Sequence, residues 1–140
     1  MRTVYVIHAP QDLEFVERTL IAPLPSLGID GWVSARHLRT AEGGDLMSHE
    51  RAMASSEAII AVVSRAAVAS ADHSDDVAIA LRGPRPVIPV RIDDTDMTSM
   101  GARIAALPRV DIGDADVAPP KDHLRRELGA LLPAHSEPPG

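Results

Sequence analysis

The sequence predicts an α/β domain built on a parallel sheet, and three observations carry this prediction. Short apolar runs alternate with polar or amphipathic segments, and the connections between them are short. The run Ala58–Val63 is apolar on both faces, which is typical of an interior strand of a parallel sheet. The chain has 140 residues, the size of one domain, and 45% of them are hydrophobic, so it can bury a core.

Five short segments are predicted strands, at residues 4–7, 29–33, 58–63, 86–92 and 110–112. Their β-branched and aromatic residues favour strand over helix. Pro89 indicates that the fourth strand lies near the edge of the sheet. Strands that alternate with helices in this way are expected to be parallel, with helices on both faces. The predicted fold is a flavodoxin-like three-layer sandwich with the strand order 2-1-3-4-5.

Helices are expected between these strands. Asp12 can cap the first of them, which carries four apolar residues on one face: Phe15, Val16, Leu20 and Ile21. Ser70 or Ser74 can cap a helix that reaches Leu81, after a loop that holds a short helical turn. Further helices are expected at residues 45–56, 102–107 and 121–132. Residues 1–133 are expected to form the domain and residues 134–140 a disordered tail.

Composition and missing motifs exclude several kinds of site. The chain has no cysteine, so disulfides and thiolate metal sites are excluded, and a cytoplasmic location is expected. The net charge of −6 argues against a nucleic-acid partner, and no apolar stretch approaches the roughly 20 residues that span a bilayer. His37 and His49 are too far apart to form a ligand pair on one helical turn, so no metal is expected. Neither a phosphate-binding glycine loop nor a nucleophile elbow is present.

Four segments carry a resemblance to one family: residues 4–6 with Asp12 six positions later, residues 28–33 followed by Leu38, residues 59–64 followed by Ser70, and residues 86–90. In their order and spacing they resemble a bacterial TIR domain, over about residues 4–112. The resemblance implies the same flavodoxin-like fold. It also implies association with other TIR domains in signalling assemblies. Many members cleave the nicotinamide–ribose bond of NAD with a glutamate on the helix after the third strand.

The resemblance assigns candidate residues for such a reaction. Ser64 and Ser70 match two serines of the family segment, His73 stands at a cysteine position, and Asp76 stands at the position of the glutamate. The candidate catalytic residue is therefore Asp76, and the candidate nucleotide-binding residues are His8, Trp32, Ser64 and Ser70. NAD would be a substrate, and no cofactor is required.

Several residues have a simpler interpretation as well. Asp76 can be one of two acids in the first turn of a helix capped by Ser74, which stabilises a helix end without catalysis. His8 can be a loop histidine without a partner, and Trp32 can belong to the core. Aspartate is shorter than glutamate by about 1.5 Å, and a misplacement near 1 Å can cost roughly 100-fold in rate.

The departures from the family therefore favour an interaction module over an enzyme. Ile7 and Ala9 replace two hydroxyl residues that line the nucleotide pocket in family members. The expected function is a TIR-type assembly domain in bacterial immune or conflict signalling, and the alternative is an NAD glycohydrolase that uses Asp76. A nucleoside deoxyribosyltransferase is a more distant alternative. A response-regulator receiver is disfavoured because Ser64 stands where it needs an aspartate.

Two loops of opposite charge suggest how copies of the domain associate. The loop at residues 34–44 is long for a strand-to-helix connection, and long ordered loops tend to carry function. The charges are those of Arg36, His37 and Arg39 on this loop and Asp93, Asp94 and Asp96 after the fourth strand. A head-to-tail contact between such loops does not close after two copies, so it predicts rings or filaments of the chain itself.

Overall fold

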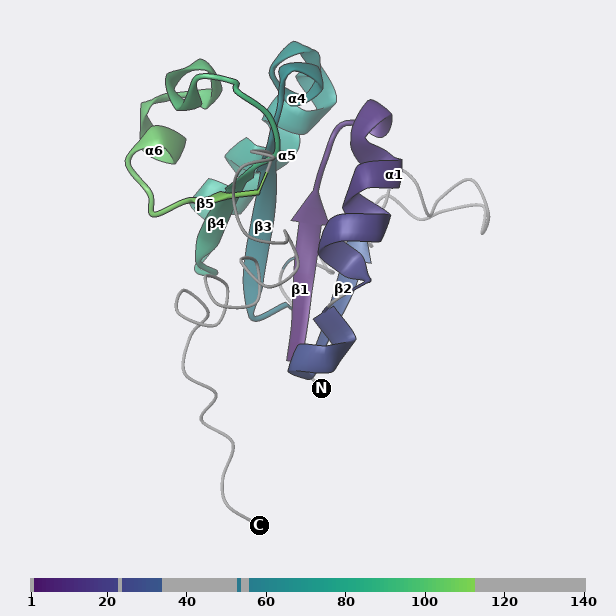
Figure 1. Ribbon diagram of the computed structural model, residues 1–140. Helices are drawn as coiled ribbons and strands as arrows, with labels where there is room; N and C mark the ends of the chain where they lie inside the picture. Colours follow the sequence, from purple (N-terminus) through teal and green to yellow (C-terminus); the bar gives the residue numbers. More distant parts are fainter. Residues whose placement is uncertain (1, 23, 34–52, 54–55, 113–140) are drawn as a thin grey trace, which may run out of the picture.

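A parallel sheet forms the middle layer of the computed structural model, which describes residues 2–22, 24–33, 53 and 56–112 (Figure 1). It has five strands in the order β2-β1-β3-β4-β5, and every neighbouring pair is parallel. The strands are β1 (Arg2–Ile7), β2 (Ile29–Val33), β3 (Ala58–Val63), β4 (Val87–Arg91) and β5 (Val110–Asp111). The predicted fold class and strand order are confirmed.

Helices cover the sheet on both sides. Along the chain they are η1 (Pro10–Asp12), α1 (Leu13–Phe15), η2 (Val16–Ile21), η3 (Leu24–Leu27), α4 (Arg65–Ala69), α5 (Ala71–Arg82), η4 (Met97–Met100) and α6 (Ala102–Ala105). The segment from η1 to η2 runs as one continuous helical stretch in front of β1 and β2, while α5 lies behind the sheet (Figure 1). The predicted three-layer arrangement is therefore confirmed, with one layer of helices on each face of the sheet.

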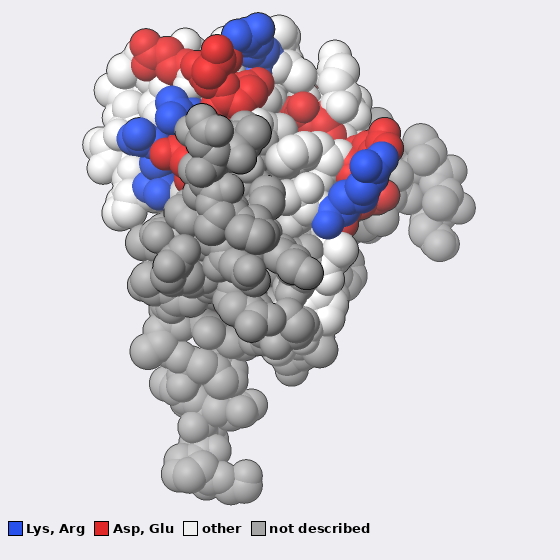
Figure 2. Space-filling view, viewed as in Figure 1, with Lys and Arg blue, Asp and Glu red and all other residues white. Residues whose placement is uncertain are grey.

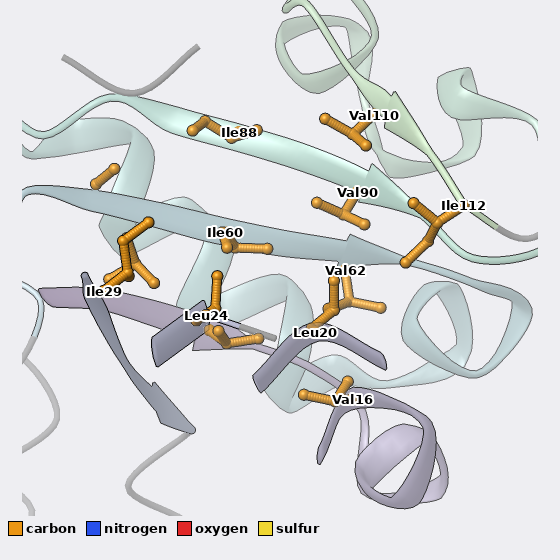
Figure 3. Close-up of a cluster of buried hydrophobic side chains, with 13 residues drawn as sticks. Val16, Leu20, Leu24, Ile29, Ile60, Val62, Ile88, Val90, Val110 and Ile112 are labelled. Atoms are coloured by element: carbon orange, nitrogen blue, oxygen red, sulfur yellow. The ribbon is translucent and has the colours of Figure 1, made fainter. Parts of the chain in front are cut away.

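The first face of the sheet packs an aliphatic cluster against η2 and η3. Figure 3 shows Val16, Leu20 and Leu24 beneath the side chains of the strands. The strand residues of this cluster alternate in sequence, as side chains on one face of a sheet do: Val4 and Val6, Ile60 and Val62, Ile88 and Val90. The apolar face predicted for the first helix is confirmed, because Val16 and Leu20 are buried and Phe15 and Ile21 pack against the cluster.

The second face packs against α5 and the segment that follows β4. Its cluster takes the other strand residues, including Tyr5, Ile7 and Ile59, together with Val77 and Ala80 from α5 and Ile104 from α6. Every side chain of β3 is buried, because the strand lies in the middle of the sheet with a packed layer on each face. The interior position predicted for β3 is confirmed.

Pro89 sits near the sheet edge, as expected. The carbonyl of Pro86 and the N–H of Ile92 both bond to β3, whereas the carbonyl of Arg91 accepts from Ile112. Odd-numbered residues of β4 thus face β5, and Pro89 is one of them. Since β5 pairs only with Val90 and Arg91, no neighbouring strand needs the N–H that proline lacks.

One capping prediction is corrected, and the structure decides between the two alternatives of another. Asp12 makes no side-chain cap to the helix that follows it, because its carboxylate accepts a hydrogen bond from Ser64 instead. The helix that reaches Leu81 begins after Ser70, whose hydroxyl caps it, and not after Ser74. The helix ends at Arg82, with Gly83 as its C-cap.

Several predicted segments lie outside the described residues. These are the loop at 34–44, most of the helix at 45–56, the helix at 121–132 and the tail at 134–140. Within the described part of the chain, no helix is long and apolar enough to cross a membrane.

Candidate functional site

The polar residues of interest gather at the carboxyl ends of β1 and β3. These strands are neighbours in the sheet, with Ile7 beside Ala61, but the chain leaves β1 toward β2 and leaves β3 toward β4. Where connections diverge in this way, a parallel sheet opens a crevice that binds ligands in many α/β proteins. His8 directly follows β1 and Ser64 directly follows β3, so both lie at this point.

Ser64 joins the loop after β1 to the start of α4. Its hydroxyl donates to Asp12 Oδ2 at 2.5 Å and accepts from the Ala67 N–H at 3.0 Å. The side chain is buried. The hydroxyl of this predicted nucleotide-binding residue is therefore engaged in capping α4 and holding Asp12.

His8 is buried, and the interpretation as a loop histidine without a partner is wrong. Its Nδ1 lies 2.8 Å from the Ala9 carbonyl oxygen, so Nδ1 carries the proton and donates. Burial lowers the pKa of His8, and Asp12 and Glu17 oppose this only in part. The ring is thus neutral at neutral pH.

His73 and Asp76 are the third and sixth residues of α5, and both face the protein interior, with 1% and 3% of their surface exposed. The interpretation of Asp76 as an acid in the first helical turn is wrong, because Asp72 occupies that turn. No hydrogen bond of ordinary geometry reaches either ring nitrogen of His73 from the described residues. Burial lowers the pKa of His73 from 6.5 to about 4; the Val62 carbonyl opposes the shift and His8 adds to it.

The other two predicted nucleotide-binding residues are Ser70 and Trp32. Ser70 serves as a helix cap, since its hydroxyl accepts from the His73 N–H at 3.2 Å. Trp32 lies in the edge strand β2, where its backbone pairs with Tyr5 of β1. The side chain of Trp32 lies outside the described part of the chain. Among the described residues, no group of three His, Asp or Glu side chains is arranged to hold a metal ion.

The three acidic residues after β4 all have intramolecular partners. Asp93 Oδ2 accepts from the Arg65 N–H at 3.0 Å, and Asp94 pairs with the Arg65 guanidinium at 2.7 Å. Asp96 caps η4 by accepting from the Thr98 N–H. Figure 2 shows acidic and basic side chains together at the upper end of the molecule, where α4 lies in Figure 1. The basic partners expected for this loop, Arg36, His37 and Arg39, lie outside the described residues.

Sequence reasoning missed His73 and the link between Asp12 and Ser64 as parts of the site. The signal for His73 was present in its three-residue spacing from Asp76, which places both on one face of a helix once Ser70 is taken as the cap. The link between Asp12 and Ser64 joins residues 52 positions apart, and no local pattern indicates it.

The fold and the site together define a class of protein: a parallel α/β sandwich with polar side chains at the carboxyl ends of β1 and β3, where the chain connections diverge. The family model described as "TIR domain" matches residues 4–128, and the chain belongs to the TIR domain family. The family predicted from the sequence is confirmed.

Solved structures agree with this assignment. The TIR domain of the Toll-related receptor TRR-2 from Hydra magnipapillata has a TM-score of 0.70 and 21% identity, with 91% of this chain and 94% of that chain covered. The TIR domains of the activated Roq1 resistosome, which recognises the pathogen effector XopQ, have a TM-score of 0.71 and 13% identity, with coverage of 94% and 100%. At these identities the likeness concerns the fold. The search of curated proteins found no match.

Proposed function

We propose that this TIR domain works by association, with copies of itself or with another TIR domain, in bacterial immune or conflict signalling in the cytoplasm. One observation carries the proposal. The only carboxylate at the position of the family glutamate, Asp76, is 3% exposed and faces the interior beside a neutral His73. This burial supports association over catalysis as the mode of action. The described Roq1 TIR domains belong to a resistosome, which supports assembly as the mode of action.

Sedimentation velocity over a range of protein concentrations, at low and high salt, tests this proposal. We expect association that weakens as salt rises, because exposed charges are screened over about 10 Å at 0.1 M salt. The variant Arg36→Glu with Arg39→Glu should abolish it. Arg18→Glu with Arg82→Glu, which changes the charge equally at exposed positions of η2 and α5, is the matched control. A chain that stays monomeric at low salt, or equal effects of both variants, would contradict association with copies of itself through these loops.

The alternative function is cleavage of NAD with Asp76 as the carboxylate. The observation that favours it is the position of Asp76: it shares one face of α5 with His73, whose pKa senses His8 at the end of β1. NAD would be the substrate, and no further cofactor is needed. Nicotinamide release, followed by chromatography, tests this alternative. We expect none from the wild type, and Asp76→Glu should raise the rate if reach is the limitation.

A further inference from the structure

The helix α4 is too short to be stable by itself. It has five residues, and isolated helices below about 12 residues are marginal in water. Only Ala67 among them is buried, so little apolar packing holds the helix against the sheet. Its position must therefore depend on the groups that bond to its N-terminus.

Two acidic residues from different loops hold that N-terminus. Asp93, after β4, accepts the N–H of Arg65, the first residue of α4. Asp12, after β1, accepts the hydroxyl proton of Ser64, and the same hydroxyl accepts the Ala67 N–H. We call Asp12, Ser64, Arg65 and Asp93 the α4 clamp. The clamp connects the carboxyl ends of three neighbouring strands, β1, β3 and β4.

Asp93 is itself well fixed. Its Oδ1 accepts from both the N–H and the hydroxyl of Thr95, so its two oxygens bond to different parts of the chain. Partial burial acts to raise the pKa of Asp93, but hydrogen bonds from Thr95 and from the Arg65 N–H outweigh it and lower that pKa. The ion pair of Asp94 with Arg65 adds little, because its two side chains are 78% and 76% exposed.

The clamp also decides where α5 begins. Ser70 is the shared boundary: its N–H bonds to the Ala67 carbonyl of α4, and its hydroxyl caps α5 at His73. The first turns of α5 therefore start from wherever α4 ends. They carry His73 and Asp76, the two buried polar side chains of this helix.

We propose that Asp12 and Asp93 are positioning residues that, through the α4 clamp, keep the buried face of α5 closed over the carboxyl ends of β1 and β3. When the hydrogen bond of either carboxylate breaks, α4 and the first turns of α5 move away from the sheet together. His73 and Asp76 then become exposed to water while the sheet stays folded. Such local opening is expected where few buried apolar contacts oppose it. The proposal does not depend on which function the domain performs.

Amide hydrogen exchange of Asp93→Ala tests the proposal. Removing one charged acceptor should speed exchange in residues 65–76 by roughly tenfold or more, with the central strand β3 as protected as in the wild type. The matched control is Asp96→Ala, which removes the same charge from the same loop, where the Asp96 carboxylate accepts from Thr98 and, among the described residues, makes no bond to α4. Exchange that rises only around Thr95, or that rises equally in both variants, would overturn the proposal.

A second readout separates positioning from general loosening. The NMR titration of the His73 ring in Asp93→Ala should move from about 4 toward the ordinary value of 6.5, because opening hydrates the ring. Asp12→Ala should give the same shift, and Asp12→Asn, which keeps an oxygen to accept from Ser64, should largely restore the wild-type titration. An unchanged His73 titration in both alanine variants, or no difference between Asp12→Ala and Asp12→Asn, would refute the clamp.

Discussion

The two faces of the sheet bury different chemistry. The face that packs against η2 and η3 holds an aliphatic cluster, with Leu20, Ile60 and Val62 fully buried in it. The face that packs against α5 holds apolar side chains along most of its length, but at the carboxyl end the same helix buries His73 and Asp76. Apolar burial stabilises both faces, whereas buried polar groups such as those on the second face cost stability unless they are hydrogen-bonded.

The largest expected effect comes from the aliphatic face. Ile60→Ala leaves a cavity in the central strand, so we expect the free energy of unfolding to fall by about 2–5 kcal/mol. Urea unfolding followed by circular dichroism measures it. Val68→Ala is the control, because Val68 is 39% exposed and should change stability by less than about 0.5 kcal/mol. Similar losses for the two variants would contradict the comparison of the faces.

The polar end should make stability depend on pH. The pKa of His73 is about 4 in the folded chain and 6.5 otherwise, so the unfolded chain binds the proton more readily. Protonation of His73 in the unfolded chain therefore lowers the free energy of unfolding as the pH drops from 6.5 toward 4, by roughly 3 kcal/mol in all. Above pH 6.5 this loss is absent. His73→Phe should flatten this part of the stability profile. A profile that keeps its slope between pH 6.5 and 4 would show that His73 is not buried as described.

A smaller effect is expected on the edge of the aliphatic face. A Cβ at Gly31 would lie 2.8 Å from Ile21 Cδ1 and from Leu24 Cδ1, so both side chains would have to move. Gly31→Ala should reduce stability by about 1–3 kcal/mol, measured as a lower urea midpoint. Gly83→Ala, whose Cβ would meet its nearest neighbour at 3.5 Å, is the control. Equal midpoints for the two variants would argue against this close packing.

The smallest effect concerns the serine that starts α5. Ser70→Ala removes the cap of the helix and should cost about 0.5–2 kcal/mol. Ser74→Ala changes an exposed residue inside the helix and should be neutral or slightly stabilising, since alanine favours helices. Thermal unfolding of the two variants compares them. A larger loss of stability in Ser74→Ala than in Ser70→Ala would indicate that Ser74, and not Ser70, caps the helix.

These effects show which parts of the molecule a sequence can reveal. Strands such as β3 were predictable because they are short runs rich in apolar and β-branched residues, and their alternation with helices predicts a parallel sheet. The start of α5 was not, because Ser70 and Ser74 are both good caps and local pattern does not choose between them. In the structure α5 follows α4, whose start is held by distant hydrogen bonds from the Arg65 N–H to Asp93 and from the Ser64 hydroxyl to Asp12. With the helix start displaced by four residues, Asp76 moved from an exposed first turn to a buried face.

The central claim is that the domain acts by association while Asp76 stays closed. The most direct test measures nicotinamide release from NAD in the same samples in which sedimentation shows assembled protein. We predict assembled wild-type protein and no release at any concentration. Release that rises with assembly and disappears in Asp76→Ala would contradict the claim and establish the enzyme instead.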